Sequence, residues 1–530
     1  MKRFMLTAMH SGAGKTVMTC AILAAFRNRG IGVRSFKCGP DYIDPMFHSR
    51  VLGIPSRNLD LFLQGEQGVK RTLFRNGEEL AVLEGAMGYY DGMAGTDSCS
   101  AWETAAKTGT PAVLAVRPKG VGVSLAAQIR GMMTFRKDSG IGGVLLSDCP
   151  AALAEYLRPI LERETGLPVF GYLPPMKEAE LGSRHLGLMT AAEIQDLSER
   201  IRLLAEQAER TVDLDGLIRL AETADDRYSE DTESGCAGNA QGMQENRGPV
   251  CRIAVSRDNA FCFCYEDSLD ALRNAGAELV FFSPAEDTAL PPETDGLYLC
   301  GGYPELYTEA LSGNTDMRQS IRECLKKGTP VIAECGGFLY LQETLEDEKG
   351  SEWPVCGVLP GKGFRTGRLQ RFGYQWLQSD RDSMLFRRGE KVPVHEFHYW
   401  DCTQNGSDLL SEKPDGRKWT CGYADEKMYA AFPHLHLGGE IPLAERFVRT
   451  CAEFRNRKRT ACWHLSSAEP EAEKVNMPRN WPSVWQKKTV RRWFIWPPWQ
   501  PAARRRTRGS PGTGGIAQDE TLSRLKNIRI

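Results

Sequence analysis

The chain has 530 residues, which is enough for two to four domains that each bury a core of their own. A formal net charge of −1 excludes a general electrostatic attraction to nucleic acid or to an anionic membrane. Sixteen cysteines are scattered without a disulfide-like framework or a Cys-x-x-Cys pair, which excludes a secreted scaffold and a zinc knuckle. No apolar stretch reaches the roughly 18 residues of a membrane-spanning helix. We expect a reduced, cytoplasmic protein that binds neither nucleic acid nor membrane.

Residues 1–220 alternate short apolar runs with helical stretches, which predicts a doubly wound α/β domain built on a parallel sheet. Helical spacing occurs over residues 15–29, 122–134 and 190–208. The predicted strands are Phe4–Met9, Val33–Cys38, Leu80–Glu84, Ala112–Val116, Gly143–Ser147 and Val169–Leu173.

Residues 221–249 are polar and acidic, with few large apolar side chains, which is typical of a linker. A second α/β pattern over residues 250–453 predicts a second domain, with a helix near residues 267–275. Its predicted strands are Cys251–Val255, Glu278–Phe282, Gly296–Leu299 and Val331–Ala333.

The end of the chain, residues 454–530, has a different composition. From about Asn456 it holds six of the eleven tryptophans, interleaved with prolines and with arginines such as Arg504–Arg506. An aromatic and basic mixture of this kind could bind a nucleic-acid backbone, but it has no periodicity. We therefore expect a disordered tail and assign it no function.

A glycine-rich loop follows the first predicted strand and leads straight into a helix. Glycines let backbone N–H groups turn toward a phosphate, the helix N-terminus favours anions, and a lysine reaches the β- and γ-phosphates. The usual spacing has a glycine where this chain has Met9, so the loop is a variant form. We predict that ATP is bound by Ser11, Gly12, Gly14, Lys15 and Thr16, and that Thr16 is a ligand of Mg²⁺.

Acidic residues follow the predicted strands in three clusters. Asp41 and Asp44 come after the strand that ends at Cys38, Glu84 ends another strand, and Asp91 follows it. In open parallel sheets, ligands bind at the carboxyl ends of the strands. We therefore expect these carboxylates near the phosphate loop, with Asp41 and Glu84 as further ligands of Mg²⁺.

A nucleophile elbow is predicted over Pro330–Leu341, where a buried strand, a tight turn and a helix place Cys335 at the bend. Small residues after Cys335 permit the turn, and the helix N-terminus favours a thiolate. The backbone N–H of Gly336 and a second glycine turn, Cys300–Glu305, would donate to an oxyanion. We predict that Cys335 is a catalytic nucleophile.

A cysteine nucleophile needs a histidine as its base. The second domain has two pairs, His395 with His398 and His434 with His436. A metal site at either pair is disfavoured because no cysteine or carboxylate set has suitable spacing. We predict that His434 is the base, with His436 as the alternative.

A phosphate loop and a thiol nucleophile on one chain together indicate amide formation, in which ATP activates a group that ammonia split from glutamine then attacks. Nine segments in the same order resemble the cobyrinic acid a,c-diamide synthase family, including its members that act on hydrogenobyrinic acid. The resemblance covers about residues 3–453. It rests on Ser11–Thr16, Lys37–Pro45, Pro55–Asp60, Glu84–Gly92, Ser183–Leu188, Cys300–Glu305, Glu334–Gly337, Arg371–Tyr374 and His395–His398.

The resemblance implies a dethiobiotin synthetase-like N-terminal domain and a class I-like glutamine amidotransferase α/β domain after it. It implies a carbon–nitrogen ligase of cobalamin biosynthesis that uses ATP, Mg²⁺ and glutamine to convert the c- and then the a-carboxylate of a corrin to carboxamides. It assigns the glutaminase nucleophile to Cys335. Substrate binding and turnover are assigned to Asp41, Tyr42, Ile43, Asp44, Glu84 and Asp91.

Several alternatives stay open. One is a phosphate-loop switch ATPase with an inert amidase-like domain. Others keep the chemistry but change the substrate to hydrogenobyrinate or to a nickel tetrapyrrole. Cobyric acid synthase is disfavoured because Asp41–Asp44 and Ser183–Leu188 match the a,c-diamide branch. The sequence also leaves a homodimer open.

Overall fold

The structure is a computed structural model that describes residues 1–75, 79–177, 191–226 and 249–467. The Ser183–Leu188 segment of the family resemblance and most of the expected linker and tail lie outside these ranges. Met1–Ala461 form one compact unit, which contains both predicted domains. None of the helices in the described ranges combines the length and the apolar composition needed to cross a bilayer.

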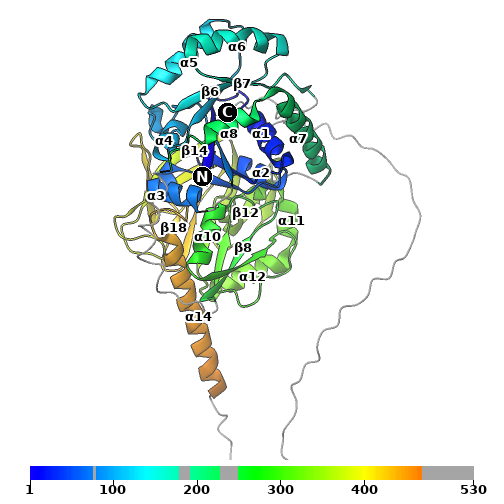
Figure 1. Cartoon of the computed structure of the whole chain (residues 1–530). Helices are drawn as coiled ribbons and strands as arrows, with labels where there is room; N and C mark the ends of the chain where they lie inside the picture. Colours follow the sequence, from blue (N-terminus) through cyan, green and yellow to red (C-terminus); the bar gives the residue numbers. More distant parts are fainter. Residues whose placement is uncertain (76–78, 178–190, 227–248, 468–530) are drawn as a thin grey trace, which may run out of the picture. The chain divides into compact units, whose positions relative to one another are not determined.

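The N-terminal region, residues 1–226, is built on a sheet of seven parallel strands. These are β1 (Lys2–Ala8), β2 (Val33–Cys38), β3 (Ser56–Leu59), β4 (Leu80–Glu84), β5 (Ala112–Val116), β6 (Ile141–Leu146) and β7 (Val169–Tyr172), labelled with the other elements in Figure 1. Their order in the sheet is β3-β2-β4-β1-β5-β6-β7. All neighbouring pairs are parallel.

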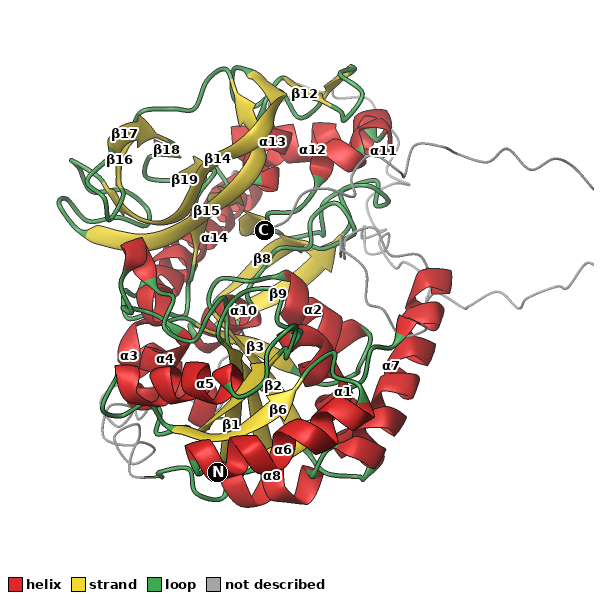
Figure 2. Cartoon of the chain, turned by 90° about the horizontal axis from the view of Figure 1, so that it is seen from above, coloured by secondary structure: helices red, strands yellow, loops and turns green. Residues whose placement is uncertain are grey.

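Helices cover both faces of this sheet, because parallel neighbours must be joined by crossover connections. Figure 2 shows them in red on either side of the yellow strands. They are α1 (Lys15–Asn28), α2 (Ile43–Arg50), α3 (Leu61–Phe74), α4 (Ala101–Lys107), α5 (Ser124–Phe135), α6 (Ala151–Thr165), α7 (Ala191–Thr211) and α8 (Leu214–Ala221), with a short 3-10 turn η1 (Met93–Gly95).

The predicted fold class of this region is confirmed. All six predicted strands form, with ends that shift by at most two residues. The strand β3 was not predicted, because its four residues include Arg57 and Asn58 and do not form an apolar run.

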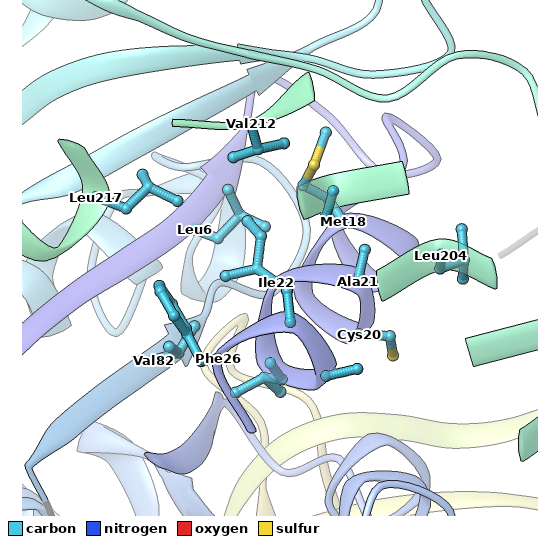
Figure 3. Close-up of a cluster of buried hydrophobic side chains, with 14 of the residues drawn as sticks. Leu6, Met18, Cys20, Ala21, Ile22, Phe26, Val82, Leu204, Val212 and Leu217 are labelled. Carbon is cyan, nitrogen blue, oxygen red and sulfur yellow. The ribbon is translucent and has the colours of Figure 1, made fainter. Parts of the chain in front are cut away.

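One apolar layer fixes the phosphate loop in place. Leu6 of β1 and Val82 of β4 pack against Ile22 and Phe26 of α1, and Figure 3 shows these side chains together. Each side chain of this size stabilises the fold by roughly 1.5–3 kcal/mol when fully buried. The loop between β1 and α1 is thus anchored at both ends, at the carboxyl edge of the sheet.

The C-terminal region, residues 249–467, contains a second sheet, which confirms the four strands predicted there. Its order is β18-β19-β11-β10-β8-β9, and only β18 runs antiparallel. The strands are β8 (Cys251–Ser256), β9 (Ala277–Phe282), β10 (Gly296–Leu299), β11 (Val331–Glu334), β18 (Tyr423–Ala424) and β19 (Met428–Ala431). The helices are α10 (Glu266–Asn274), α11 (Thr308–Gly313), α12 (Thr315–Lys326), α13 (Gly336–Leu341) and α14 (Leu443–Ser467), with η4 (Pro304–Leu306).

A third, mostly antiparallel sheet was not anticipated. Its longest members, β14 and β15, pair along most of their length, but their register slips twice between Arg365 and Gly373. The strands are β12 (Thr344–Glu346), β13 (Glu352–Pro354), β14 (Lys362–Gln378), β15 (Lys391–Cys402), β16 (Leu409–Glu412), β17 (Lys418–Cys421) and β20 (His434–Leu435).

The beginning of the expected disordered tail is helical instead. The helix α14 continues to Ser467, so residues 454–467 belong to it. Phe447 and Cys451 anchor the helix in the core, and Lys458 forms an ion pair with the buried Asp295 at 2.8 Å. These contacts carry the helix beyond the predicted boundary.

Candidate active site

The phosphate loop takes the backbone shape that its glycines permit. Gly12 and Gly14 have φ of 77° and 87°, in the left-handed region that glycine favours. Lys15 is buried, and its Nζ donates to the carbonyl of His10 at 3.3 Å and to that of Met87. Burial, followed by repulsion from Lys37, lowers the pKa of Lys15 to about 8. The ammonium is thus held where a bound anion would stabilise its charge.

A buried lysine, Lys37 at the end of β2, contacts three of the predicted acidic residues. Its Nζ lies 2.9 Å from Glu84 Oε1, 2.7 Å from Asp44 Oδ2 and 4.0 Å from Asp41 Oδ2. Burial alone would lower the pKa of Lys37, but the three carboxylates raise it above its ordinary value. Thr16 Oγ1 donates to the same oxygen of Glu84 at 2.7 Å. The strand ends thus meet beside the phosphate loop as expected.

Two of the three predicted Mg²⁺ ligands fit that ion. The hydroxyl of Thr16 and the carboxylate of Glu84 are adjacent oxygen donors, and Mg²⁺ takes only one or two protein oxygens beside phosphates and waters. Asp41 joins this pair only through Lys37. Within the described ranges there is no group of three or more His, Cys, Asp and Glu residues that could hold a metal.

The loop that carries Asp41 caps the start of α2. Asp41 Oδ1 accepts hydrogen bonds from the backbone N–H of Ile43 at 2.7 Å and of Asp44 at 3.3 Å. Asn58 Nδ2 donates to the carbonyls of Gly39 and Asp41 and braces the loop from β3. Desolvation, followed by repulsion from Asp44, raises the pKa of Asp41 to about 6.

Asp91 lies apart from the Lys37 cluster. It is exposed, and its Oδ2 accepts a hydrogen bond from the backbone N–H of Gly88 at 2.9 Å. The same loop supplies the Met87 carbonyl to Lys15, so Asp91 is held on the segment that borders the phosphate loop.

Cys335 stands on a sharp elbow between β11 and α13. Its φ of 48° is in the left-handed region, which is rare for a residue other than glycine. A Cβ placed on Gly336 would lie 3.0 Å from the backbone nitrogen of Gly302 and 2.8 Å from Pro304 Cδ. The two predicted glycine turns therefore meet beside the cysteine, as an oxyanion site requires.

Burial governs the protonation of the elbow. It raises the pKa of the Cys335 thiol above its ordinary value, and the nearby Glu305 adds to this effect. Burial also raises the pKa of Glu305 to about 8. The resting cysteine is therefore a thiol, and its attack on a substrate needs a base to take the proton.

His434 is buried beside the residue that precedes Cys335. Its Nδ1 lies 3.7 Å from Glu334 Oε2, to which Tyr298 donates at 3.1 Å. Glu334 Oε1 accepts the backbone N–H of Leu435 at 2.9 Å. Glu334 thus holds the His434 segment next to the elbow.

The other histidines have different surroundings. Neither ring nitrogen of His436 has a hydrogen-bond partner among the residues that the structure describes, and burial lowers its pKa to about 3. Burial also lowers the pKa of His395 to about 3. His398 bonds to Glu396 at 2.6 Å and stacks on Phe432 in a buried network.

Tyr42 connects the two parts of the site. Its ring, at the start of α2, stacks on Tyr265 and Phe263 of the C-terminal region, with centroids 4.4 Å and 5.1 Å apart. The ring of His434 is 5.2 Å from it. A cavity of about 100 Å³ borders Tyr42 and is lined by residues of both regions, among them Asn58, Ser256, Arg257 and Glu266. The phosphate-loop site and the cysteine elbow therefore approach each other through this tyrosine.

Several known proteins are similar to this chain. Residues 252–440 match a family described as a CobB/CobQ-like glutamine amidotransferase domain. The chain is 35% identical over 457 residues to a cobyrinate a,c-diamide synthase of Caldanaerobacter subterraneus subsp. tengcongensis, covering 85% of this chain and 98% of that one. It is 37% identical over 449 residues to that of Clostridium tetani, covering 83% and 98%, and 35% identical over 462 residues to that of Thermoplasma volcanium, covering 86% and 98%.

The chain belongs to the cobyrinate a,c-diamide synthase family. This confirms the resemblance inferred from the nine sequence segments. It also confirms the amidotransferase fold class of the C-terminal region and the enzyme class, a glutamine-dependent amidating ligase.

Some residues that shape the site of this family member were not assigned roles from the sequence. Lys37 is a charged residue in an otherwise buried strand, and that contrast is a usable signal. Tyr374 reaches the N-terminal region, where its hydroxyl donates to Asp60 Oδ2 at 2.7 Å. No local pattern predicts that contact, because the two residues are 314 positions apart.

Proposed function

We propose that the chain catalyses the ATP- and glutamine-dependent amidation of the a- and c-carboxylates of cobyrinate in cobalamin biosynthesis. The observation that carries this proposal is the contact of Tyr42 with His434, because it links a carboxylate-binding loop to a glutaminase-like elbow within one compact unit. The family supports the substrate, since its members named above are cobyrinate a,c-diamide synthases.

The first half-reaction activates the carboxylate. A carboxylate does not react with ammonia at neutral pH, because oxide is a very poor leaving group. The carboxylate oxygen attacks the γ-phosphorus of ATP, the bond to the β-phosphate oxygen breaks, and an acyl phosphate and ADP form. Ser11, Gly12, Gly14 and Lys15 hold the phosphates. Thr16 and Glu84 would hold Mg²⁺, which would neutralise phosphate charge, and Asp41 Oδ2 lies 4.0 Å from Lys37 Nζ beside them.

The substrate carboxylate enters beside the loop after β2. Asp41, Tyr42, Ile43, Asp44 and Asp91 position the substrate, and Lys37 keeps the buried acids from repelling it by neutralising part of their charge. The raised pKa of Asp41, to about 6, lowers the negative charge of this loop as pH falls.

The second half-reaction releases ammonia. His434 takes the proton of Cys335, the thiolate attacks the amide carbon of glutamine, and the N–H groups of Gly336 and Gly302 stabilise the oxyanion. Collapse of the intermediate, with a proton returned to the leaving nitrogen, yields ammonia and a thioester. Water then hydrolyses the thioester to glutamate and restores the thiol. Ammonia displaces phosphate from the acyl phosphate to give the carboxamide.

Ammonia has to travel from Cys335 to the acyl phosphate without becoming ammonium. We assign this route to the surroundings of Tyr42, where Phe263 and Tyr265 stack on its ring and would exclude water. Hydrogenobyrinate and a nickel tetrapyrrole remain alternative substrates for the same chemistry.

A direct test gives the enzyme ATP, glutamine and each of the three tetrapyrroles in turn, and counts the amides by mass spectrometry. We expect two amides on cobyrinate, with one ADP and one glutamate released per amide. Two amides on the nickel tetrapyrrole alone would replace cobyrinate as the substrate. ATP hydrolysis without amidation of any tetrapyrrole would favour the switch ATPase.

A further inference from the structure

One face of the β14–β15 pair is lined by aromatic rings. It consists of Phe372, Tyr374, His395, Phe397 and Tyr399, which we call the aromatic face. Neighbouring ring centroids lie 5.4–5.9 Å apart along it. The ring planes are 70–87° apart, so the rings pack edge to face, as aromatic pairs often do, and His395 lies buried among them.

This face borders the substrate loop of the N-terminal region. The hydroxyl of Tyr374 donates to Asp60 at 2.7 Å, and a Cβ placed on Gly39 would lie 3.9 Å from that hydroxyl. Gly39 and Asp60 follow the carboxyl ends of β2 and β3, where open parallel sheets bind their ligands. The aromatic face therefore continues directly from the edge at which the carboxylate is activated.

A bulge brings Phe372 to the surface of the face. The ladder pairs Gln370 with His398 and Gly373 with Glu396, so β14 carries an extra residue between these pairs. Arg371 within the bulge has a φ of 39°, a strained value for an arginine. The bulge thus turns Arg371 and Phe372 in different directions.

Arg371 fixes the bulge through ion pairs with acidic residues of β15. Its guanidinium bonds to Glu396 at 2.8 Å and to Asp401 at 2.8 Å and 3.0 Å. Lys413 Nζ donates to the carbonyls of Arg371 at 2.8 Å and of Phe372 at 2.6 Å. Phe372 nevertheless remains 52% exposed. A network of this strength that fixes a large apolar side chain in an exposed position suits a ligand-binding surface better than a core.

We propose that the aromatic face, with Phe372 at its exposed end, is the platform on which the tetrapyrrole macrocycle lies while its carboxylate reaches the Asp41–Asp44 loop. This inference rests on the proposed function, because that function supplies a ligand with a large macrocycle and apolar methyl groups on its periphery. An exposed aromatic side chain gains free energy when it buries apolar surface of a bound ligand. The platform orients the ring, and the orientation decides which side-chain carboxylate is activated.

The test compares Phe372→Ala with Phe372→Tyr and with Tyr156→Ala, a control that removes an aromatic ring 61% exposed on α6. Cobyrinate is the probe, and its Kd is measured by ultrafiltration without ATP and glutamine. We expect Phe372→Ala to raise that Kd and the KM for cobyrinate at least about 5-fold. The KM for glutamine stays unchanged, Phe372→Tyr restores binding, and Tyr156→Ala has no effect.

The possible results distinguish a failure of the platform proposal from a failure of the proposed function. If the wild type amidates cobyrinate and Phe372→Ala binds it as tightly as the wild type, the platform is wrong and the proposed function stands. If the wild type neither binds nor amidates any tetrapyrrole, both fail. If Phe372→Ala changes the sedimenting mass but not the Kd, the face is a contact between copies of this chain and the platform is wrong.

Discussion

The ring of Tyr42 lies 5.2 Å from the ring of His434, centroid to centroid, and this contact joins the N-terminal and C-terminal regions. Asp41 and Ile43, the neighbours of Tyr42, form the cap of α2. Glu334, the neighbour of Cys335, lies 3.7 Å from His434. A displacement of the Asp41 loop on substrate binding would therefore move the ring of His434 through its contact with Tyr42.

We expect weaker packing around Tyr42 to uncouple the two half-reactions. Phe263→Leu removes a ring that stacks on Tyr42 but belongs to no predicted substrate-binding set. The ratio of glutamate released to amide formed should rise by at least about threefold, as befits the loss of an aromatic pair. Amidation driven by ammonium salts should stay close to the wild-type rate. A ratio that stays at one would show that the stacking of Phe263 on Tyr42 does not couple the sites.

Cys335→Ser should separate the two activities. Glutamine-dependent amidation should fall by about three orders of magnitude, because the serine hydroxyl is a much weaker nucleophile than a thiolate. Amidation with ammonium chloride should persist, since the phosphate loop and the Lys37 cluster are untouched. Both rates are read from the mass of the tetrapyrrole product. Loss of the ammonium-dependent rate in a folded variant would contradict this division of labour.

His434 and His436 can be distinguished by the same substitution at each position. His434→Asn should reduce glutaminase activity by about two orders of magnitude or more, as expected for removal of a general base. His436→Asn should retain most activity, because the ring of His436 packs at a tilt against Tyr265 and lines a cavity beside Gly439 and Glu440. Release of glutamate is the measurement. The reverse result would make His436 the base.

Lys37 should contribute strongly to stability. Lys37→Met leaves Glu84 and Asp44 buried without their shared cation, and such changes cost about 3–5 kcal/mol. The matched control is Lys2→Met, which removes a half-exposed pair with Glu222 and should cost less than about 1 kcal/mol. Urea unfolding followed by circular dichroism gives both values. Equal costs would mean that the carboxylates become protonated at little expense.

Asp60 should make stability depend on pH. Burial raises the pKa of Asp60 to about 6, against about 3.9 in an unfolded chain, so the folded state binds the proton more tightly. The resulting stabilisation is complete below about pH 4 and is lost as pH rises through about 6. Relative to Asp60→Asn, the wild type should lose up to roughly 3 kcal/mol between pH 4 and pH 7. Urea midpoints at the two pH values measure this, and a constant difference would contradict it.

The parts of the structure that could be predicted are those whose signal lies in neighbouring residues of the sequence. The strands β2, β4, β5 and β10 were predicted to the residue, because the residues that define each strand are neighbours in the sequence. The phosphate loop and the elbow were found for the same reason. The third sheet was missed because β14 is 17 residues long and is interrupted by a bulge, so its alternation of apolar and polar residues is broken.

Contacts between segments that are distant in the sequence could not be predicted from local patterns. Tyr42 could be placed in the substrate loop, but its contacts with Phe263 and His434 depend on how two regions pack. The role of Lys37 depends on Glu84 and Asp44, which belong to different elements, β4 and α2. Reading motifs one at a time therefore identifies the groups but not the contacts between them.

The hydrogen bond from Tyr374 to Asp60 limits how the halves of this enzyme could be exchanged. An amidotransferase half borrowed from another protein could still supply ammonia. It would leave the buried Asp60 without the phenol that helps to satisfy its charge, and α3 would begin at a weakened cap. A functional hybrid would have to bring its own β14–β15 pair or be supplied with this one, so the exchangeable part is larger than the glutaminase machinery alone.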